Sequence, residues 1–147
     1  MNNIAIRVCR VPGSPATPLP AYATPGSSGM DLSSAADMTV RPGETVLVPT
    51  GLRLEIPEGF EAQVRPRSGL AVRHGIGVLN SPGTIDSDYR GELKIILSNF
   101  GKQDFTIRRN DRVAQLVVAP VVRAVLVEVA EINETSRSEG GFGHTGT

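Results

Sequence analysis

The sequence predicts a single all-β domain, and three observations support that prediction. Short apolar runs recur with a period of two, as in half-buried strands. Gly and Pro, at 16 and 11 of the 147 residues, separate these runs at the spacing of a sandwich, jelly roll or barrel. Only one segment has the pattern of a helix. We expect roughly ten or more short strands, with no internal repeat of fixed period.

The first half of the chain is expected to alternate strands and turns. Ile4, Ile6 and Val8 recur at every second position, which predicts a first strand with one buried face. The Pro-rich stretch 12–25 predicts a loop, and an extended pattern resumes at residues 29–32. Turns at 41–44, 49–51 and 57–59 then separate strands at 45–48, 52–56 and 60–64.

The second half contains the one expected helix and the remaining strands. Ser68 is placed to cap a short helix that runs to about His74. Strands are expected at Val78 and at residues 92–98, 105–107, 113–118 and 124–129. From Asn133 the apolar pattern stops, so we expect a folded domain over 1–132 and a flexible Gly-rich arm over 133–147.

Composition excludes several classes of protein. Fifteen Lys and Arg balance fifteen Asp and Glu, so no basic surface for nucleic acid is expected. The single cysteine, Cys9, excludes an intramolecular disulfide framework and a Cys-based zinc site. The N-terminus lacks the pattern of a signal peptide, and no apolar run is long enough to span a bilayer. We therefore expect a cytoplasmic protein that does not enter a membrane.

Standard nucleotide and hydrolase motifs are absent or misplaced. Residues 141–146 match GxGxxG, but they end the chain with no helix after them, which argues against a Rossmann site. There is no Walker A lysine motif and no GxSxG elbow around Ser68. The two histidines offer no strong metal spacing, and His74 is interpreted as structural rather than catalytic.

The stretch Asn80–Lys94 is the first candidate for chemistry. It opens with turn residues, carries Asp86, Asp88 and Tyr89, and ends in an alternating apolar run typical of a strand. A carboxylate held in a loop between strands suits a general base. The alternative is a polar hairpin with solvated acids.

Two further stretches suggest the binding of phosphate and metal. Arg67, Ser68 and Gly69 offer a guanidinium, a hydroxyl and an unobstructed backbone N–H, which suit an anion; a capped helix beside a surface Arg is the alternative. Asp31, beside a glycine, suits an acid that holds water on Mg²⁺, although Asp is also common at the end of a loop.

Taken together, five stretches resemble the five ordered motifs of the homotrimeric dUTP pyrophosphatase (dUTPase) family. They are SGMDL at 28–32, RPRSGLA at 65–71, NSPGTIDSDYRG at 80–91, RVAQL at 112–116 and RSEGGFG at 137–143. The resemblance implies a jelly-roll-like subunit of the β-barrel or β-clip type. It also implies a homotrimer in which the arm of one chain closes a neighbour's active site. The implied reaction converts dUTP and water to dUMP and pyrophosphate with Mg²⁺, lowering dUTP and supplying dUMP for thymidylate synthesis.

The resemblance also implies roles in the central stretch. Asp86 matches the general base that activates the water attacking the α-phosphorus. Tyr89 matches the aromatic ring under the deoxyribose, which leaves no room for a 2′-hydroxyl. The uracil-reading hairpin matches Asn80 to Lys94, where an extended backbone meets the edge of the base. Its substrate-binding positions are Asn80, Gly83, Thr84, Ile85, Asp86, Tyr89 and Lys94.

The remaining implied roles concern the phosphates, the metal and the arm. Arg67, Ser68 and Gly69 match the phosphate cradle, Gln115 matches a further phosphate contact, and Asp31 matches the acid that holds water on Mg²⁺. On the arm, the matching positions are Arg137 for the γ-phosphate, Phe142 for stacking on uracil, and Gly143, His144 and Thr145 for closure over the nucleotide.

Three positions depart from the family pattern: Met30, Ser138 and His144. None of them is the implied base, sugar platform or phosphate cradle, although the contact made by His144 stays open. Two alternatives to a dUTPase also stay open. A dCTP deaminase shares the implied fold but needs a different catalytic acid and a pocket for cytosine. A non-catalytic β-roll could instead serve as a nucleotide sensor.

Overall fold

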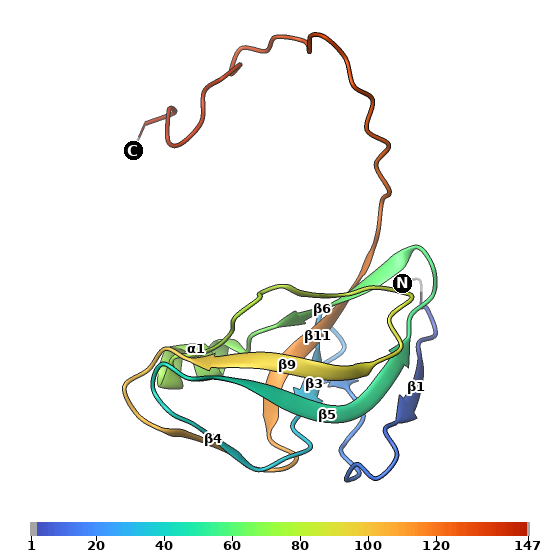
Figure 1. Ribbon diagram of the computed structural model, residues 1–147, viewed down its shortest axis with the longest axis vertical. Helices are drawn as coiled ribbons and strands as arrows, with labels where there is room; N and C mark the ends of the chain where they lie inside the picture. The colour runs from blue at the N-terminus through green and yellow to red at the C-terminus, as the bar shows by residue number, and fades with distance from the viewer. Residues whose placement is uncertain (1–2, 147) are drawn as a thin grey trace.

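The computed structural model describes residues 3–146, whose longer strands form two antiparallel sheets that enclose one core (Figure 1). The four-stranded sheet has the order β1 (Arg7–Arg10), β5 (Thr45–Glu55), β9 (Glu92–Asn99), β7 (Ile76–Val78). The five-stranded sheet has the order β2 (Ala21–Tyr22), β3 (Met30–Ser33), β11 (Arg112–Pro120), β6 (Phe60–Arg65), β8 (Gly83–Ile85). A separate pair joins β4 (Met38–Val40) to β10 (Phe105–Ile107).

The core fills the space between the two larger sheets. Val48, Ile95 and Leu97 come from the first sheet, and Leu32, Ala62 and Leu116 come from the second. Leu116 is 1 % exposed, and the other five have no exposed surface. Burial of such aliphatic faces is the main favourable term in folding. The all-β class expected from the period-two pattern and the jelly-roll-like architecture implied by the resemblance are both confirmed.

Strand β5 corrects one expected turn. The sequence predicted a break at residues 49–51, but the strand runs unbroken from Thr45 to Glu55. The turn residues instead form an irregularity in the ladder with β9, where Gly51 has a φ of 71°. Thr50 stabilises it, because its buried hydroxyl donates to the Leu93 carbonyl at 2.6 Å and accepts from the Leu52 N–H at 3.2 Å.

The predicted buried face of the N-terminal strand and the predicted strand at residues 124–129 were both wrong. The N-terminal strand begins only at Arg7 and all four of its residues are exposed; Ile4 and Val8 are 36 % and 39 % exposed. Residues 124–129 form no strand, and Leu126 is 94 % exposed. Beyond Pro120 the chain leaves the two sheets and extends away from them (Figure 1). Of the alternating apolar residues at the N-terminus, only Ile6 is partly buried against the core.

The predicted helix is present, but the predicted cap is wrong. Helix α1 spans Ser68–His74, and its N-cap residue is Arg67, which makes no side-chain capping hydrogen bond. The Ser68 hydroxyl lies in the first turn and is exposed. Gly75 ends the helix in the left-handed conformation with a φ of 67°. Across residues 3–146, no helix is long and apolar enough to span a membrane.

Candidate active site

One group of predicted site residues gathers around Asp31 on β3. The Asp31 carboxylate is 16 % exposed and its Oδ1 lies 3.4 Å from Nε of Arg67. Its Oδ2 lies 3.1 Å from Nη1 of Arg112, at the start of β11. Arg67 also donates from Nη1 to the Arg112 carbonyl at 2.9 Å. This cluster brings two guanidinium groups and one carboxylate together at the junction of β3, β11 and the start of α1.

Gln115 lies in the same region because of strand register. It pairs with Asp31 on one side and with Arg65 on the other. Gly29 permits this packing, since a Cβ there would lie 3.3 Å from Cβ of Gln115. Gly69, in the first turn of α1, has no neighbour within 4 Å of where its Cβ would be. No packing contact within this chain therefore requires a glycine at position 69.

The second group of predicted residues lies in the connection between β8 and β9, and it corrects the expected hairpin. β8 pairs with β6 in the five-stranded sheet, whereas β9 pairs with β5 and β7 in the four-stranded sheet. Asn80–Lys94 thus crosses between the two sheets. The alternating apolar run of β9 fits either arrangement, so sequence periodicity could not distinguish them.

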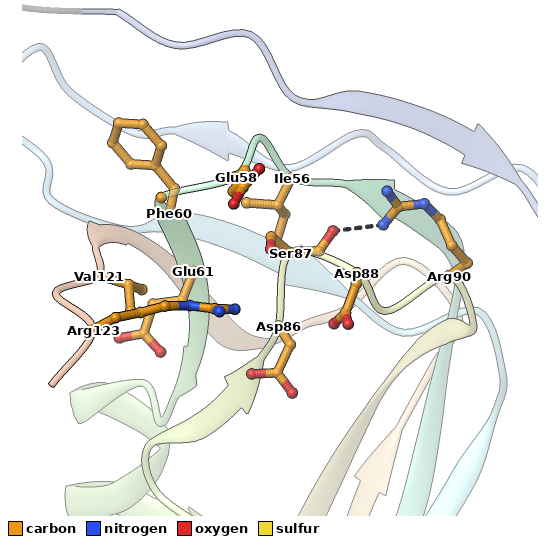
Figure 2. Close-up of a pocket in the computed structure, with 11 residues that line it drawn as sticks. Ile56, Glu58, Phe60, Glu61, Asp86, Ser87, Asp88, Arg90, Val121 and Arg123 are labelled. Atoms are coloured by element: carbon orange, nitrogen blue, oxygen red, sulfur yellow. Dashed lines mark hydrogen bonds between the residues drawn. The ribbon is translucent and has the colours of Figure 1, made fainter. Parts of the chain in front are cut away.

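Asp86 follows β8 directly and lines an open cleft of about 690 Å³. Figure 2 shows Asp86 and Asp88 at this cleft together with Glu61 of β6 and Arg123 of the segment that follows β11. The Asp86 side chain is exposed. The backbone carbonyl of Asp86 accepts a hydrogen bond from the Tyr89 N–H at 3.2 Å. Arg67, Ser68 and Gln115 do not line this cleft.

Tyr89 is held against its own loop. Its hydroxyl donates to the Glu92 carbonyl at 2.9 Å, and its ring covers Gly91, where a Cβ would collide with the tyrosine oxygen. Gly83 plays a similar part for Asn80, because a Cβ at Gly83 would lie 3.1 Å from Nδ2 of Asn80. These two glycines allow close contacts within the loop.

The other predicted positions in this stretch differ in exposure. Ile85 is 7 % exposed and belongs to the core, which leaves only its backbone for a ligand. The Thr84 side chain is exposed. Lys94 is exposed, and its Nζ lies 3.7 Å from Oε2 of Glu92.

The predicted arm residues lie in the extended segment beyond β11 (Figure 1). Arg137 donates from Nε to the Gly140 carbonyl at 2.7 Å, and the Phe142 ring is fully exposed. Phe142 and Gly143 have φ values of 48° and 84°, and the His144 N–H donates to the Gly141 carbonyl at 3.1 Å. Thr145 is exposed. These residues form local turns and make no hydrogen bond to the sheets among those described.

The donor set fits a magnesium ion only if a ligand supplies further oxygens. Within residues 3–146, no group of three His, Cys, Asp or Glu side chains could hold a metal by itself. Mg²⁺ commonly takes one or two carboxylates, several waters and the phosphates of a substrate. Asp31, a single largely enclosed carboxylate beside two cations that suit phosphate, has the chemistry of such a shared site.

Sequence reasoning missed two contributions that the structure supplies. Arg112 was noted only as a long donor at the start of a strand with a solvated edge as the alternative, and its ion pair to Asp31, the shorter of the two, was not predicted. Gly91 was not identified as the residue that admits the Tyr89 ring. The available signal was spacing, since Gly91 follows Tyr89 by two residues and Arg112 begins the predicted strand that carries Gln115.

Comparison with solved structures defines the class of fold. The chain superposes on a variant of Staphylococcus bacteriophage 80alpha dUTPase with dUpNHpp, with a TM-score of 0.89, 22% identity and coverage of 99% of this chain and 100% of that one. A variant of the dUTPase from phage phi11 of S. aureus, in a structure described for its coordination of a structural Mg(II) ion, gives a TM-score of 0.79 at 22% identity over 87% and 98% of the two chains. The fold is therefore that of the dUTPases.

Sequence comparison then establishes the family. The dUTPase family model matches residues 16–146. The deoxyuridine 5'-triphosphate nucleotidohydrolase of Anaplasma marginale is 56% identical over 98% of this chain and 99% of its own length. The protein of the same name from Syntrophotalea carbinolica is 55% identical over 99% of each chain. This chain belongs to the dUTPase family.

Proposed function

We propose that this protein hydrolyses dUTP to dUMP and pyrophosphate with Mg²⁺ in the cytoplasm. The observation that carries the proposal is the separation of two complementary halves of one site. One half, around Arg67 and Asp31, offers cations for a triphosphate. The other, around Asp86 and Tyr89, offers an exposed carboxylate and a fixed aromatic ring. A nucleotide needs both halves.

The two halves lie too far apart to act on one phosphorus atom within a single chain. Three strand spacings separate Asp31 on β3 from β8, because the order is β3, β11, β6, β8. Asp86 lies further along β8, on the side away from the Arg67 end of β6. Strand geometry gives a separation on the order of 15 Å. A base must approach within hydrogen-bond reach of the proton it removes, so each complete site needs the base of one copy and the cradle of another.

The segment beyond β11 supports a third contribution from another copy. Val125, Leu126, Val127 and Val129 expose between 56 % and 94 % of their surface, which is unfavourable unless a partner covers them. An apolar groove near β1, with exposed Ile4, Val8, Leu19 and Tyr22, offers a surface of matching character. In our proposal residues 121–132 dock on a neighbour and the arm at 133–147 closes a site there. A closed homotrimer then completes three equivalent sites.

Catalysis at such a site needs water activation and charge stabilisation. Asp86 orients and deprotonates the water that attacks the α-phosphorus. Arg67, Ser68, Gly69 and Gln115 hold the phosphates, and the open space at Gly69 suits close approach of a phosphate to the backbone. Arg112 joins this group as a second guanidinium.

Substrate selection and closure fall to the remaining residues. Tyr89 packs under the deoxyribose and excludes a 2′-hydroxyl, while backbone groups of 80–94 read uracil. Asn80, Gly83, Thr84, Ile85 and Lys94 contribute through that segment. Arg137 binds the γ-phosphate, Phe142 stacks on the base, and Gly143, His144 and Thr145 close over the nucleotide.

When bound, Mg²⁺ would be chelated by the triphosphate and would supply charge stabilisation for the pyrophosphate leaving group. Asp31 would hold waters of that ion. The two carboxylate oxygens of Asp31 face Arg67 and Arg112 in this structure. Binding of the phosphates to these arginines would leave the two oxygens available to water.

The test is incubation of the purified protein with dUTP and with dCTP in the presence of Mg²⁺. We expect pyrophosphate from dUTP and no ammonia from dCTP. Ammonia release from dCTP would identify a deaminase instead. Binding of dUTP without pyrophosphate release would identify a nucleotide sensor.

A further inference from the structure

The C-terminal end of helix α1 is in direct contact with the loop that joins β9 to β10. The Phe100 N–H donates to the Gly75 carbonyl at 2.8 Å. A Cβ at Gly75 would lie 2.7 Å from the Gly101 nitrogen, and a Cβ at Gly101 would collide with the His74 carbonyl oxygen. The two backbones therefore touch at a point where a side chain on either glycine would separate them.

A buried amide holds this loop in shape. Asn99, at the end of β9, is 1 % exposed. Its Nδ2 donates to the carbonyls of Val40 and Gln103, each at 2.8 Å, and its Oδ1 accepts from the Gly101 N–H at 2.8 Å. Both amide hydrogens and the amide oxygen of Asn99 therefore have hydrogen-bond partners. Asn99 therefore fixes where Gly101 lies relative to β4 and β9.

Helix α1 has few other supports. It has seven residues, none of them fully buried, and it lacks a side-chain cap at its N-terminus. Isolated helices of this length are unstable, so their position depends on what they pack against. Leu70 packs on the core from one side, and the His74 ring lies 5.2 Å from the Phe105 ring at the other end.

We propose that Asn99 and Gly101 are positioning residues for the phosphate cradle. Asn99 fixes the loop, Gly101 sets how closely the C-terminal end of α1 approaches it, and α1 carries that placement to Arg67, Ser68 and Gly69. Neither residue belongs to the proposed set of substrate contacts. The inference rests on the proposed function of these three residues as the cradle.

The test variant is Gly101→Ala in the full chain. Gly101 lacks a left-handed φ, so the added methyl group acts through contact with α1 rather than through backbone strain. We expect the KM for dUTP to rise by on the order of tenfold to a hundredfold, because small misplacements of binding groups are costly. Hydrogen exchange at the α1 amides should accelerate in the free protein. Binding of deoxyuridine, which has no phosphate, should stay at the wild-type level.

Two further variants make the result decisive. Lys102→Ala is the matched control, since Lys102 is an exposed residue of the same loop; it should behave as wild type. Asn99→Ser keeps both glycines but replaces the amide with a shorter hydroxyl that cannot make all three hydrogen bonds, and it should reproduce the Gly101→Ala pattern if that variant fails to fold.

The outcomes distinguish failure of the positioning role from failure of the proposed phosphate cradle. Wild-type exchange and KM in Gly101→Ala, with a raised KM in Arg67→Ala, would overturn the positioning role and leave the cradle in place. An unchanged KM in Arg67→Ala would remove the cradle and the inference with it. A parallel loss of deoxyuridine binding in Gly101→Ala would show general damage and also overturn the inference.

Discussion

Asp31 and Arg67 form an ion pair in which Oδ1 of the carboxylate lies 3.4 Å from Nε of the guanidinium. The two residues are on different elements, β3 and the start of α1, and they have opposite preferences for a nucleotide. Arg67 attracts a triphosphate, whereas Asp31 repels it unless a metal ion lies between them. The pair therefore predicts that phosphate and metal bind together.

Replacing Asp31 tests that coupling. We expect Asp31→Asn to raise the Mg²⁺ concentration needed for half-maximal activity by about tenfold, since the amide holds metal-bound water less strongly than a carboxylate. A Mg²⁺ titration of dUTP hydrolysis measures it. Asp37→Asn, at an exposed acid between β3 and β4 whose Oδ1 acceptor the amide retains, serves as the control. An unchanged titration in Asp31→Asn would exclude this residue from the metal site.

Two substitutions at Tyr89 separate its ring from its hydroxyl. Tyr89→Ala removes the ring and should raise turnover of UTP relative to dUTP. Tyr89→Phe loses only the hydrogen bond to the Glu92 carbonyl, which contributes roughly 0.5–1.5 kcal/mol, so discrimination should persist with a small loss of stability. Ratios of kcat/KM for the two nucleotides report the effect. Equal ratios in the wild type and Tyr89→Ala would rule out a steric role for the ring.

Asp86→Asn tests the proposed base. The amide keeps the size of the side chain but cannot take a proton, so kcat should fall by roughly 10²–10⁴ while dUTP still binds. Single-turnover kinetics and equilibrium binding measure the two effects separately. Asp88→Asn, at the other exposed acid of the same loop, should keep most of the activity. If the two variants have the same kcat, Asp86 has no special role.

Truncations distinguish the arm from the segment that precedes it. Ending the chain before Arg137 should leave the oligomer intact and abolish most turnover, because only site-closing residues are lost. Ending it after Pro120 should also remove exposed Val125 and Leu126 and dissociate the oligomer. Sedimentation and dUTP hydrolysis report both properties. Full activity in the protein that ends before Arg137 would show that the arm takes no part in catalysis.

Much of the fold could be predicted because alternation and turn residues are local properties. The strand at Phe105–Ile107 was predicted with its observed bounds, and the helix at Ser68–His74 also agrees. The failures share a different origin. Whether Thr50 and Gly51 form a turn or an irregular strand depends on Leu93, which is distant in sequence. Residues 124–129 alternate as a strand would, yet they form none and stay exposed, which a local pattern does not reveal.

The candidate site could be predicted as a set of residues but not as an arrangement. The motifs identified Asp31, Arg67 and Asp86 by type and order. Strand order alone determines that Asp31 and Arg67 come together while Asp86 lies across the sheet. Such order is a property of long-range pairing, which periodicity does not encode.

Subunit mixing tests the shared site most directly. Asp86→Asn and Arg67→Ala are denatured together in equal amounts, refolded and assayed at a dUTP concentration at which neither variant alone has appreciable activity. If each site takes its base and its cradle from different copies, random assembly leaves about a quarter of the sites intact, and activity should recover to about that share of the wild type. If one chain supplies both groups, no intact site can form. Activity that stays at the level of the separate variants, in a mixture shown to contain hybrid oligomers, would contradict the shared site.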